Sequence, residues 1–343
     1  MIKEIKLETL RDKVQRCIHN YLEIADNYHL EFGIYYYGQL FRYSSNQQKH
    51  LYDIGSLSKT FTAHLILKLI DNKQLDINDN IGKYLNLPNG YYPTIYELLT
   101  HTAGYNNLTP VEITIKGLLK HRYISHNPYD NCTEEDIIKA LIKRNKKKAI
   151  NRYGYSDFSY AILAIIIEKI TKKTFLHAME EFIKNDLAMQ KTTFFADNRK
   201  IMAVNKNKRY NYWHWNTDNP YLASGGLISD INDMLQYLKT QIESEESFIT
   251  NAHKIQKIKS KSNITMAFGW HSYQNSRQLW HVGGVGTFRS SLIFNKKKNF
   301  GVVVLGNAKG IKSANVHYLA KMLYSEIKIN KFKGDNTNGI NNN

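Results

Sequence analysis

The spacing of apolar residues changes along the chain, and the order of these changes outlines a fold. Apolar residues at steps of three and four predict an amphipathic helix over residues 7–24. Apolar runs then predict strands over residues 30–36, 40–43 and 51–54, with the first two joined as a hairpin. A helical apolar pattern returns at Phe61 and continues to Ile70. The chain therefore opens as a helix, three strands and a second helix.

Between about Leu75 and Thr217 the strand pattern fades and helical signals dominate. Capping boxes at Thr94–Glu97 and Thr133–Asp136 each predict the start of a helix, because the two side chains satisfy free backbone N–H groups at a helix N-terminus. The further helices that periodicity predicts here cover residues 158–171 and 175–182.

Strand patterns return near the C-terminus, after a predicted helix over residues 229–242. A last helix is predicted over 314–327, and the Asn-, Lys- and Gly-rich residues 330–343 are expected to be disordered. The strands predicted between these two helices cover residues 267–273, 279–282, 288–294 and 301–306.

Strands at both ends of the chain with helices between them predict an α+β fold. We expect one antiparallel sheet, built from both termini and flanked by the terminal helices, with a mostly helical lobe inserted. Residues 1–75 together with 220–329 would form the sheet lobe, and residues 76–219 the helical lobe. A cleft between the lobes is where a site is expected.

The composition supports a globular protein with a basic surface. Of 343 residues, 42% are apolar, which is enough for cores in both lobes. The 47 Lys and Arg residues exceed the 30 Asp and Glu residues and give a net charge of +17, which favours anionic partners such as a cell-envelope polymer, lipid headgroups or nucleic acid. The basic clusters at 139–152 and 254–261 lack interleaved aromatic residues, which argues against nucleic acid.

Cysteine content and hydropathy limit which cofactors and which cellular compartment are expected. Cys17 and Cys132 are the only cysteines, so no disulfide framework and no Cys/His metal spacing is implied, and we expect neither metal nor cofactor. The longest apolar run, residues 160–167, is too short to span a bilayer, and the first residues lack the apolar core of a signal peptide. As written, the chain is expected to be cytoplasmic, or extracytoplasmic if a leader has been removed.

A candidate nucleophile lies where the third predicted strand runs into the second helix. Ser56 follows Gly55 at this turn, and a helix N-terminus offers N–H groups and partial positive charge to an oxyanion. Lys59 lies on the same helical face as Ser56 and can take the proton of the serine hydroxyl. The alternative is an N-cap serine followed by an exposed lysine. The same spacing at Ser325–Lys328 has no preceding strand or glycine turn, so we interpret that copy as a solvated helix face.

Three other stretches carry chemistry. In Tyr153–Asp157 a glycine-bearing turn would present the Tyr155 hydroxyl and the Asp157 carboxyl together, although a packed turn tyrosine is the commoner situation. In Trp280–Gly286 the glycines admit a substrate backbone and His281 can donate a hydrogen bond to it, unless this is a bulge with an incidental histidine. Leu98–Gly104 is interpreted as a helix end closed by its glycine.

Together and in this order, these stretches resemble the serine β-lactamase and penicillin-binding protein superfamily. The resemblance is to the branch with class C β-lactamases, D-alanyl-D-alanine carboxypeptidases and esterases, and it covers roughly residues 10–328. The motifs that carry it are Gly55–Ala63, Leu98–Gly104, Tyr155-Ser156-Asp157 in place of Tyr-x-Asn, Ala223–Leu227, Phe268-Gly269-Trp270, and His281-Val282-Gly283-Gly284 in place of Lys-Thr-Gly.

The resemblance implies a β-lactamase/transpeptidase-like fold and an acyl-enzyme mechanism. Ser56 would attack a carbonyl, while Lys59, Tyr155 or both accept its proton and Tyr155 protonates the leaving group. The N–H groups of Ser56 and Gly284 would form the oxyanion hole. The other substrate-binding positions that it implies are Asp157, His281, Gly283 and, by its proximity in sequence, Arg289.

Two departures from the family pattern leave the substrate class open. Asp157 adds negative charge beside Lys59 and could hold it protonated, and His281 offers less positive charge to a substrate carboxylate than the usual Lys. Arg289 would then supply that charge, although an exposed strand arginine is an equal alternative.

Three functions therefore stay open. The first is a penicillin-binding serine hydrolase acting on D-alanyl peptides or esters. The second is a class C type β-lactamase. The third is a non-catalytic binding or sensing protein that keeps the fold.

Overall fold

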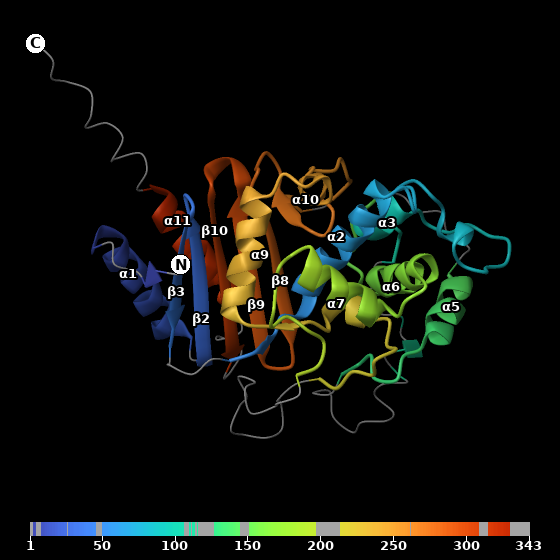
Figure 1. Ribbon diagram of the computed structural model, residues 1–343, viewed down its shortest axis with the longest axis horizontal. Coiled ribbons are helices and arrows are strands. Elements are labelled where there is room, and N and C mark those ends of the chain that lie inside the picture. Colours follow the sequence, from blue (N-terminus) through green and yellow to red (C-terminus); the bar gives the residue numbers. More distant parts are fainter. Residues whose placement is uncertain are drawn as a thin grey trace, which may run out of the picture.

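The computed structural model describes most of the chain, and its centre is one eight-stranded sheet (Figure 1). The strand order is β1-β3-β2-β10-β9-β8-β7-β6, and every neighbouring pair is antiparallel except the parallel pair β1 and β3. The described residues are 3–4, 8–25, 27–45, 50–105, 110, 112–113, 115, 127–144, 151–196, 213–260, 262–308 and 315–329.

The sheet joins the two ends of the chain, as predicted. Val302 of β10 lies opposite Ile34 of β2, so a C-terminal strand pairs with an N-terminal one at the middle of the sheet. Both strands are fully buried at this point because helices cover both faces. The strands are β1 (Lys3–Glu4), β2 (Asn27–Tyr36), β3 (Gln39–Ser44), β6 (Ile264–Met266), β7 (His271–Tyr273), β8 (Leu279–Val285), β9 (Phe288–Asn295) and β10 (Phe300–Ala308).

Helices from both termini cover one face of the sheet. Helices α1 (Glu8–Ile24) and α11 (Val316–Ile329) contact each other, and α11 packs on β9 and β10. Their apolar stripes meet the sheet in one hydrophobic cluster that contains Tyr21, Val304 and Leu323. Helix α9 (Ile231–Glu243) covers the opposite face, so the sheet is the middle of three layers (Figure 1).

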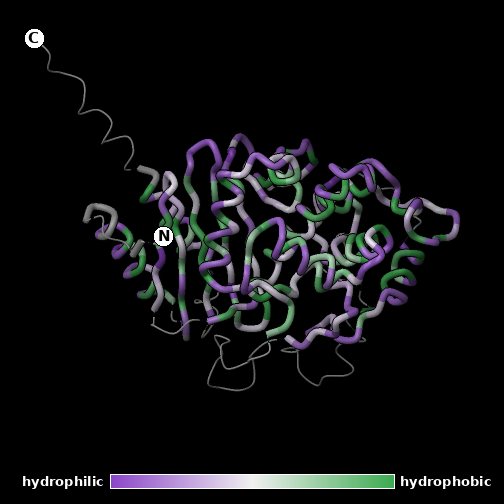
Figure 2. The backbone as a smooth tube through the Cα atoms, in the orientation of Figure 1, coloured by the Kyte–Doolittle hydropathy of each residue, from purple (hydrophilic) through white to green (hydrophobic). Residues whose placement is uncertain are grey.

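A second and larger hydrophobic cluster extends from the α9 face of the sheet into the helices beside it. Helix α2 runs through its centre, and its side chains from Ser58 to Leu67 are all buried. Figure 2 shows hydrophobic residues concentrated in these interior elements and hydrophilic residues in turns along the upper edge. The helices here are α2 (Ser58–Asp71), α3 (Ile95–Leu99), α5 (Glu134–Lys143), α6 (Asp157–Thr171), α7 (Phe175–Asn185), α8 (Leu222–Gly225) and α10 (Ser247–Ala252), with short 3₁₀ turns η1 (Gly55–Leu57), η2 (Ile81–Lys83) and η4 (Lys296–Lys298).

Several local predictions are confirmed. Capping boxes at Thr94 and Thr133 open α3 and α5, with each threonine side chain accepting the N–H of the residue three positions on. Ser325, in the second Ser-x-x-Lys copy, is exposed on α11.

Other local predictions are wrong. Of the strand expected over residues 267–273, only β7 forms, because residues 267–270 make a turn between β6 and β7 in which Gly269 has φ +78° and Ala267 donates its N–H to Trp270 O. The strand expected at 51–54 is only β4 (Tyr52–Asp53), which pairs with β5 (Ile228–Ser229) in a separate two-stranded sheet. Strand β1 was not predicted.

The end of α3 also differs from the prediction. His101 takes the left-handed conformation, with φ +56°, directly after the helix, while Gly104 lies three residues further on. The histidine therefore closes the helix, where a glycine was expected. The tail at 330–343 and most of the loops at 106–131 and 197–219 lie outside the described residues, and the division into two lobes stays a prediction.

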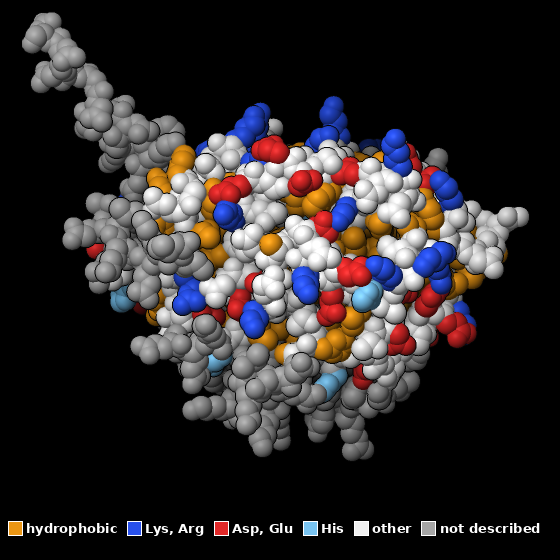
Figure 3. Space-filling view, in the orientation of Figure 1, with side chains coloured by type: hydrophobic (Ala, Val, Ile, Leu, Met, Phe, Trp, Pro, Cys, Tyr) orange, Lys and Arg blue, Asp and Glu red, His pale blue; other side chains and the backbone are white. Residues whose placement is uncertain are grey.

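Neither a membrane-spanning helix nor a metal cluster occurs within the described ranges. No helix in them combines the length and apolar character needed to cross a membrane, and no three of their His, Cys, Asp or Glu side chains cluster as metal ligands. On the face in Figure 3, basic and acidic side chains are interspersed, so the positive net charge does not gather in one patch there.

Candidate active site

Ser56 lies in a turn that several hydrogen bonds hold rigid. The turn is η1, between β4 and α2, and Gly55 has φ +53° in it. The Ser58 hydroxyl donates to Gly55 O at 2.7 Å and accepts the Leu227 N–H at 3.1 Å. Ile54 donates its own N–H to Leu227 O at 3.0 Å. The turn that presents Ser56 is therefore tied to the Ala223–Leu227 motif.

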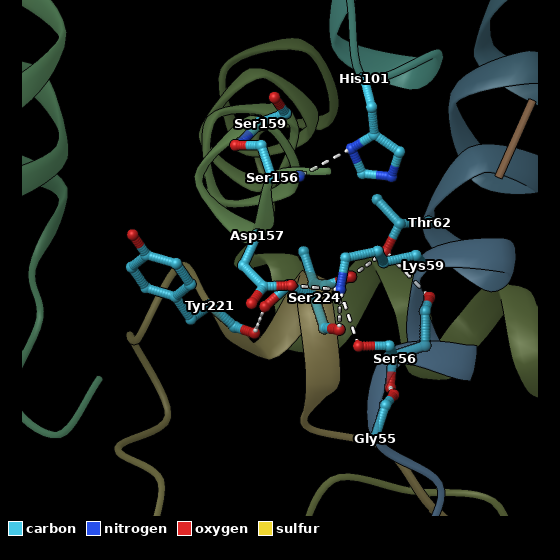
Figure 4. Close-up of polar contacts among 12 residues, drawn as sticks. Gly55, Ser56, Lys59, Thr62, His101, Ser156, Asp157, Ser159, Tyr221 and Ser224 are labelled. Atoms are coloured by element: carbon cyan, nitrogen blue, oxygen red, sulfur yellow. Dashed lines mark hydrogen bonds and ion pairs between the residues drawn. The ribbon is translucent and has the colours of Figure 1, made fainter. Parts of the chain in front are cut away.

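Lys59 is completely buried on the first turn of α2, and its ammonium group has a full set of acceptors (Figure 4). Nζ donates to Ser56 Oγ at 3.1 Å and to Ser224 O at 2.7 Å, and it lies 2.5 Å from Asp157 Oδ1. An ammonium has three N–H groups, so these three oxygens satisfy it. Lys59 is therefore not the exposed lysine of the alternative considered above.

The Asp157 carboxylate is the counter-ion of Lys59. It stands at the first position of α6, and its other oxygen accepts the Tyr129 hydroxyl at 2.7 Å. Burial lowers the pKa of Lys59 below its usual value, and the negative charge and hydrogen bond of Asp157 partly offset that effect. A buried charge without this partner would be strongly destabilising.

Tyr155 joins the same group of side chains. Lys59 Nζ lies 5.0 Å from the centre of its ring. Burial raises the pKa of Tyr155 well above 10, and the charge of Asp157 raises it further, while a hydrogen bond with the Ser56 side chain acts in the opposite direction. Tyr155 is therefore a neutral phenol near pH 7, which suits a proton donor.

Strand β8 lies against η1 so closely that Gly283 of the strand and Gly55 of the turn have no room for a side chain. A Cβ on Gly283 would come within 1.9 Å of Ile54 O, and one on Gly55 within 2.6 Å of Gly284 N. Both contacts are closer than real Cβ atoms come to other atoms. The Ser290 hydroxyl donates to the same Ile54 O at 2.7 Å. This contact brings the backbone of Gly284 beside that of Ser56, the arrangement an oxyanion hole needs.

His281 is buried at the floor of the site, and one contact fixes its tautomer. Nδ1 lies 2.8 Å from the carbonyl oxygen of Val282, which can only accept, so Nδ1 carries the proton. Burial lowers the pKa of His281 well below 6.5, and neighbouring His271 and Lys59 lower it further. The neutral ring therefore presents Nε2 as an acceptor, and the expected hydrogen bond from His281 to a substrate would require protonation at Nε2.

These residues line one pocket of about 590 Å³. Arg289 lines it opposite Gly284 in the β8 and β9 pairing, with Nη1 donating to Gly286 O at 2.8 Å and Phe288 O at 2.6 Å. The candidate residues that the structure brings together there are Ser56, Tyr155, His281, Gly283, Gly284 and Arg289, with Lys59 and Asp157 directly behind Ser56.

Other side chains of the site were not singled out from the sequence. Tyr129 holds Asp157, and Tyr153 contacts His271 Nε2 at 3.0 Å beneath His281. The pocket continues to Asn315 and His317 at the start of α11. Apart from Tyr153, which opens the Tyr153–Asp157 stretch, these residues carry no motif, so only the folded chain identifies them.

The chain is similar to known proteins over most of its length. A family model described as Beta-lactamase matches residues 24–325. "Protein flp" from Staphylococcus aureus (strain MW2) is 25% identical over 296 residues, which are 79% of this chain and 54% of that protein. "Teichoic acid D-alanine hydrolase" from Staphylococcus aureus (strain NCTC 8325 / PS 47) is 25% identical over 305 residues, with 86% and 70% covered. The chain thus spans about half the length of the flp proteins that it matches.

A solved structure extends the comparison to the fold. "Beta-Lactamase/D-Alanine Carboxypeptidase" from Pseudomonas syringae aligns with a TM-score of 0.76 and 17% identity, covering 92% of this chain and 99% of that one. The likeness confirms the predicted β-lactamase/transpeptidase-like fold.

Proposed function

Because this chain belongs to the Beta-lactamase family, a family of serine hydrolases, we propose that it forms an acyl-enzyme at Ser56 with penicillins and with D-alanyl peptides or esters. The observation that carries the proposal is the 3.1 Å contact between Lys59 Nζ and Ser56 Oγ beside the Gly284 backbone. A serine oxygen becomes a nucleophile when a neighbouring group can take its proton, and this amine is the nearest such group on α2.

The proposed reaction assigns each proton. Ser56 Oγ attacks the carbonyl carbon and gives its proton to the neutral form of Lys59, which burial favours. The N–H groups of Ser56 and Gly284 stabilise the oxyanion. As the bond to the leaving group breaks, Tyr155 protonates that group and recovers a proton from Lys59. Water then attacks the acyl-enzyme, releasing the acid and restoring the Ser56 hydroxyl.

Among substrates, the site favours an acyl donor without a carboxylate next to His281. A neutral imidazole whose Nε2 accepts hydrogen bonds gives no positive charge to such a carboxylate. An uncharged ester has no carboxylate at that position and needs no such charge. The relative named teichoic acid D-alanine hydrolase supports a D-alanyl ester on an anionic cell-envelope polymer as the substrate class. An extracytoplasmic location belongs to this proposal.

The test is covalent labelling. Wild-type protein exposed to a fluorescent penicillin should be labelled, and Ser56→Ala should not, while Ser325→Ala is the matched control for the second Ser-x-x-Lys copy. Intact-mass measurement after exposure to β-lactams, D-alanyl peptides and short-chain esters then reports which acyl groups attach and how long they persist. Equal labelling of wild type and Ser56→Ala would contradict the proposal.

A second candidate is a β-lactamase, favoured by the structural neighbour from Pseudomonas syringae, which is named for both activities. The two candidates differ in the rate at which water releases the acyl group. Nitrocefin turnover above about one per second, within the usual enzymatic range, would favour the β-lactamase.

A further inference from the structure

His101 is a buried histidine in a backbone conformation that histidines seldom adopt. It follows α3 with φ +56° and is 1% exposed. A non-glycine residue with positive φ is uncommon, and such conformations persist where the surrounding structure holds them. His101 does not line the pocket, so packing of substrate does not account for it.

Two hydrogen bonds connect His101 to the residues on either side of Tyr155. The carbonyl oxygen of His101 accepts the Gly154 N–H at 2.8 Å, and its Nδ1 accepts the Ser156 N–H at 3.1 Å (Figure 4). The left-handed backbone directs the carbonyl and the side chain toward the same loop. The main chain is therefore held both before and after Tyr155.

The ring of His101 supports the Tyr155 side chain as well. The two ring centres lie 4.6 Å apart at 34°, and Tyr160 packs on the imidazole at 5.2 Å. Since Nδ1 accepts a hydrogen bond, the ring must carry its single proton on Nε2. Burial, with His271 and Lys59 nearby, lowers the pKa of His101 well below 6.5, which keeps Nδ1 available as an acceptor.

We propose that His101 is a positioning residue that fixes Tyr155 against Ser56 through Gly154, Ser156 and the face of its own ring. This inference rests on the proposed function, in which Tyr155 moves a proton while Ser56 is acylated. Positioning of this kind acts on the rate of acylation, because a displacement of about 1 Å can cost about 100-fold in rate. It leaves the binding step before acylation untouched.

The experiment measures the acylation rate constant and the preceding dissociation constant separately, by stopped-flow with a fluorescent penicillin. His101→Gly accepts positive φ but has no ring and no acceptor, so acylation should slow by about 100-fold with an unchanged dissociation constant. His101→Asn also tolerates positive φ, and its Oδ1 can replace Nδ1. His101→Asn should therefore acylate at least about 10-fold faster than His101→Gly.

The matched control for stability is Thr192→Val. Thr192 has a buried hydroxyl bonded to Ser229 and Asp233, away from the pocket, so this variant loses buried hydrogen bonds without touching the Tyr155 loop. Its acylation constant should equal that of wild type. If His101→Gly does not fold, His101→Asn is compared with His101→Gln. The longer glutamine side chain cannot place its amide oxygen at the Nδ1 position. The Asn variant should therefore acylate about 10-fold faster than the Gln variant.

The outcomes separate the two proposals. If wild type is not labelled at all, the proposed function fails. If wild type is labelled and His101→Gly acylates at the wild-type rate, or if Asn restores no more than Gly or Gln, the positioning role is overturned. An increased dissociation constant with an unchanged acylation rate constant would also overturn the positioning role.

Discussion

The ammonium of Lys59 lies 2.5 Å from the carboxylate of Asp157, with Lys59 completely buried. The pair is held from both sides, because Tyr129 donates to the other Asp157 oxygen at 2.7 Å and Ser224 O accepts from Lys59 at 2.7 Å. An asparagine, the residue usual in the resembled family, would supply a hydrogen bond but no charge. Asp157 therefore sets how readily Lys59 releases a proton.

Asp157→Asn should move the acidic limb of the acylation profile to lower pH. Asp157 raises the pKa of Lys59 and burial lowers it, so removing the carboxylate leaves burial unopposed and more of the amine neutral at pH 7. At pH values on the acidic limb, the acylation rate should rise about 10-fold for each pH unit by which the limb moves. The measurement is the second-order acylation rate of wild type and variant between pH 5 and about pH 9.

Tyr129→Phe is the matched control for that change. It removes the hydrogen bond to Asp157 but keeps the carboxylate charge beside Lys59. Its limb should move less than that of Asp157→Asn. Superimposable profiles for wild type and Asp157→Asn would mean that Asp157 does not tune Lys59.

Asp53, on β4 two residues before Gly55, should make folding stability depend on pH. Burial raises the pKa of this carboxyl to about 8 from its usual 3.8, so the folded protein holds a proton that the unfolded chain has released. The resulting stabilisation is complete below about pH 4 and is lost as pH rises toward 8, with a slope of up to about 1.4 kcal/mol per pH unit.

Urea denaturation at intervals from pH 5 to about pH 8 checks this prediction in wild type and Asp53→Asn. The amide cannot ionise, so the variant should lack this part of the pH dependence. Parallel stability curves for the two proteins would show that Asp53 ionises normally in the fold.

Two adjacent glycines of β8 should differ in how much stability the protein loses when each is replaced by alanine. A Cβ on Gly283 would lie 1.9 Å from the backbone oxygen of Ile54, so Gly283→Ala must push β8 away from η1. The three atoms nearest to a Cβ on Gly284 would all belong to the Arg289 side chain, at 3.5 Å or more, which is ordinary contact. We expect Gly283→Ala to lose about 1–3 kcal/mol of stability.

Thermal unfolding of both variants, with penicillin labelling of Gly283→Ala, tests this pair. Gly284→Ala should unfold near the wild-type temperature, because alanine suits a strand at least as well as glycine. Labelling of Gly283→Ala should fall with the displacement of the Gly284 N–H from Ser56. Equal unfolding temperatures for both variants would contradict the close packing of β8 on η1.

The parts of the site that depend on local spacing or on the motifs of the resembled family could be predicted from the sequence, and the remaining tertiary contacts could not. Ser56 and Lys59 are one helical turn apart, so their contact follows from the spacing of the motif. Ser224 O reaches Lys59 from 165 positions away in the chain, and Tyr129 reaches Asp157 from another loop. No local pattern encodes these contacts.

The fold shows the same limit. A single sheet built from both termini followed from the strands predicted at both ends of the chain. The turn at Gly269 was hidden inside an apolar run, because Ala267, Phe268 and Trp270 are all buried. A buried turn and a buried strand present the same hydropathy. His101 was likewise hidden, because glycine is the usual residue for the left-handed end of a helix.

His281→Lys should change which substrates the site prefers. The histidine is neutral and offers Nε2 as an acceptor, so it gives no charge to a substrate carboxylate. A lysine ammonium in the same pocket would form a charge-assisted hydrogen bond to that carboxylate, worth about 1.5–3 kcal/mol. Acylation by a carboxylate-bearing penicillin should therefore improve about 10-fold or more relative to an uncharged ester.

The measurement is the ratio of second-order acylation rates for the penicillin and the ester at pH 7, in wild type, His281→Lys and His281→Gln. The glutamine variant keeps a neutral polar group and separates the effect of charge from that of shape. Its ratio should stay near that of wild type, because neither side chain is charged there. If His281→Lys left the ratio unchanged, the carboxylate would be recognised elsewhere, and Arg289, which lines the same pocket, would be the next residue to replace.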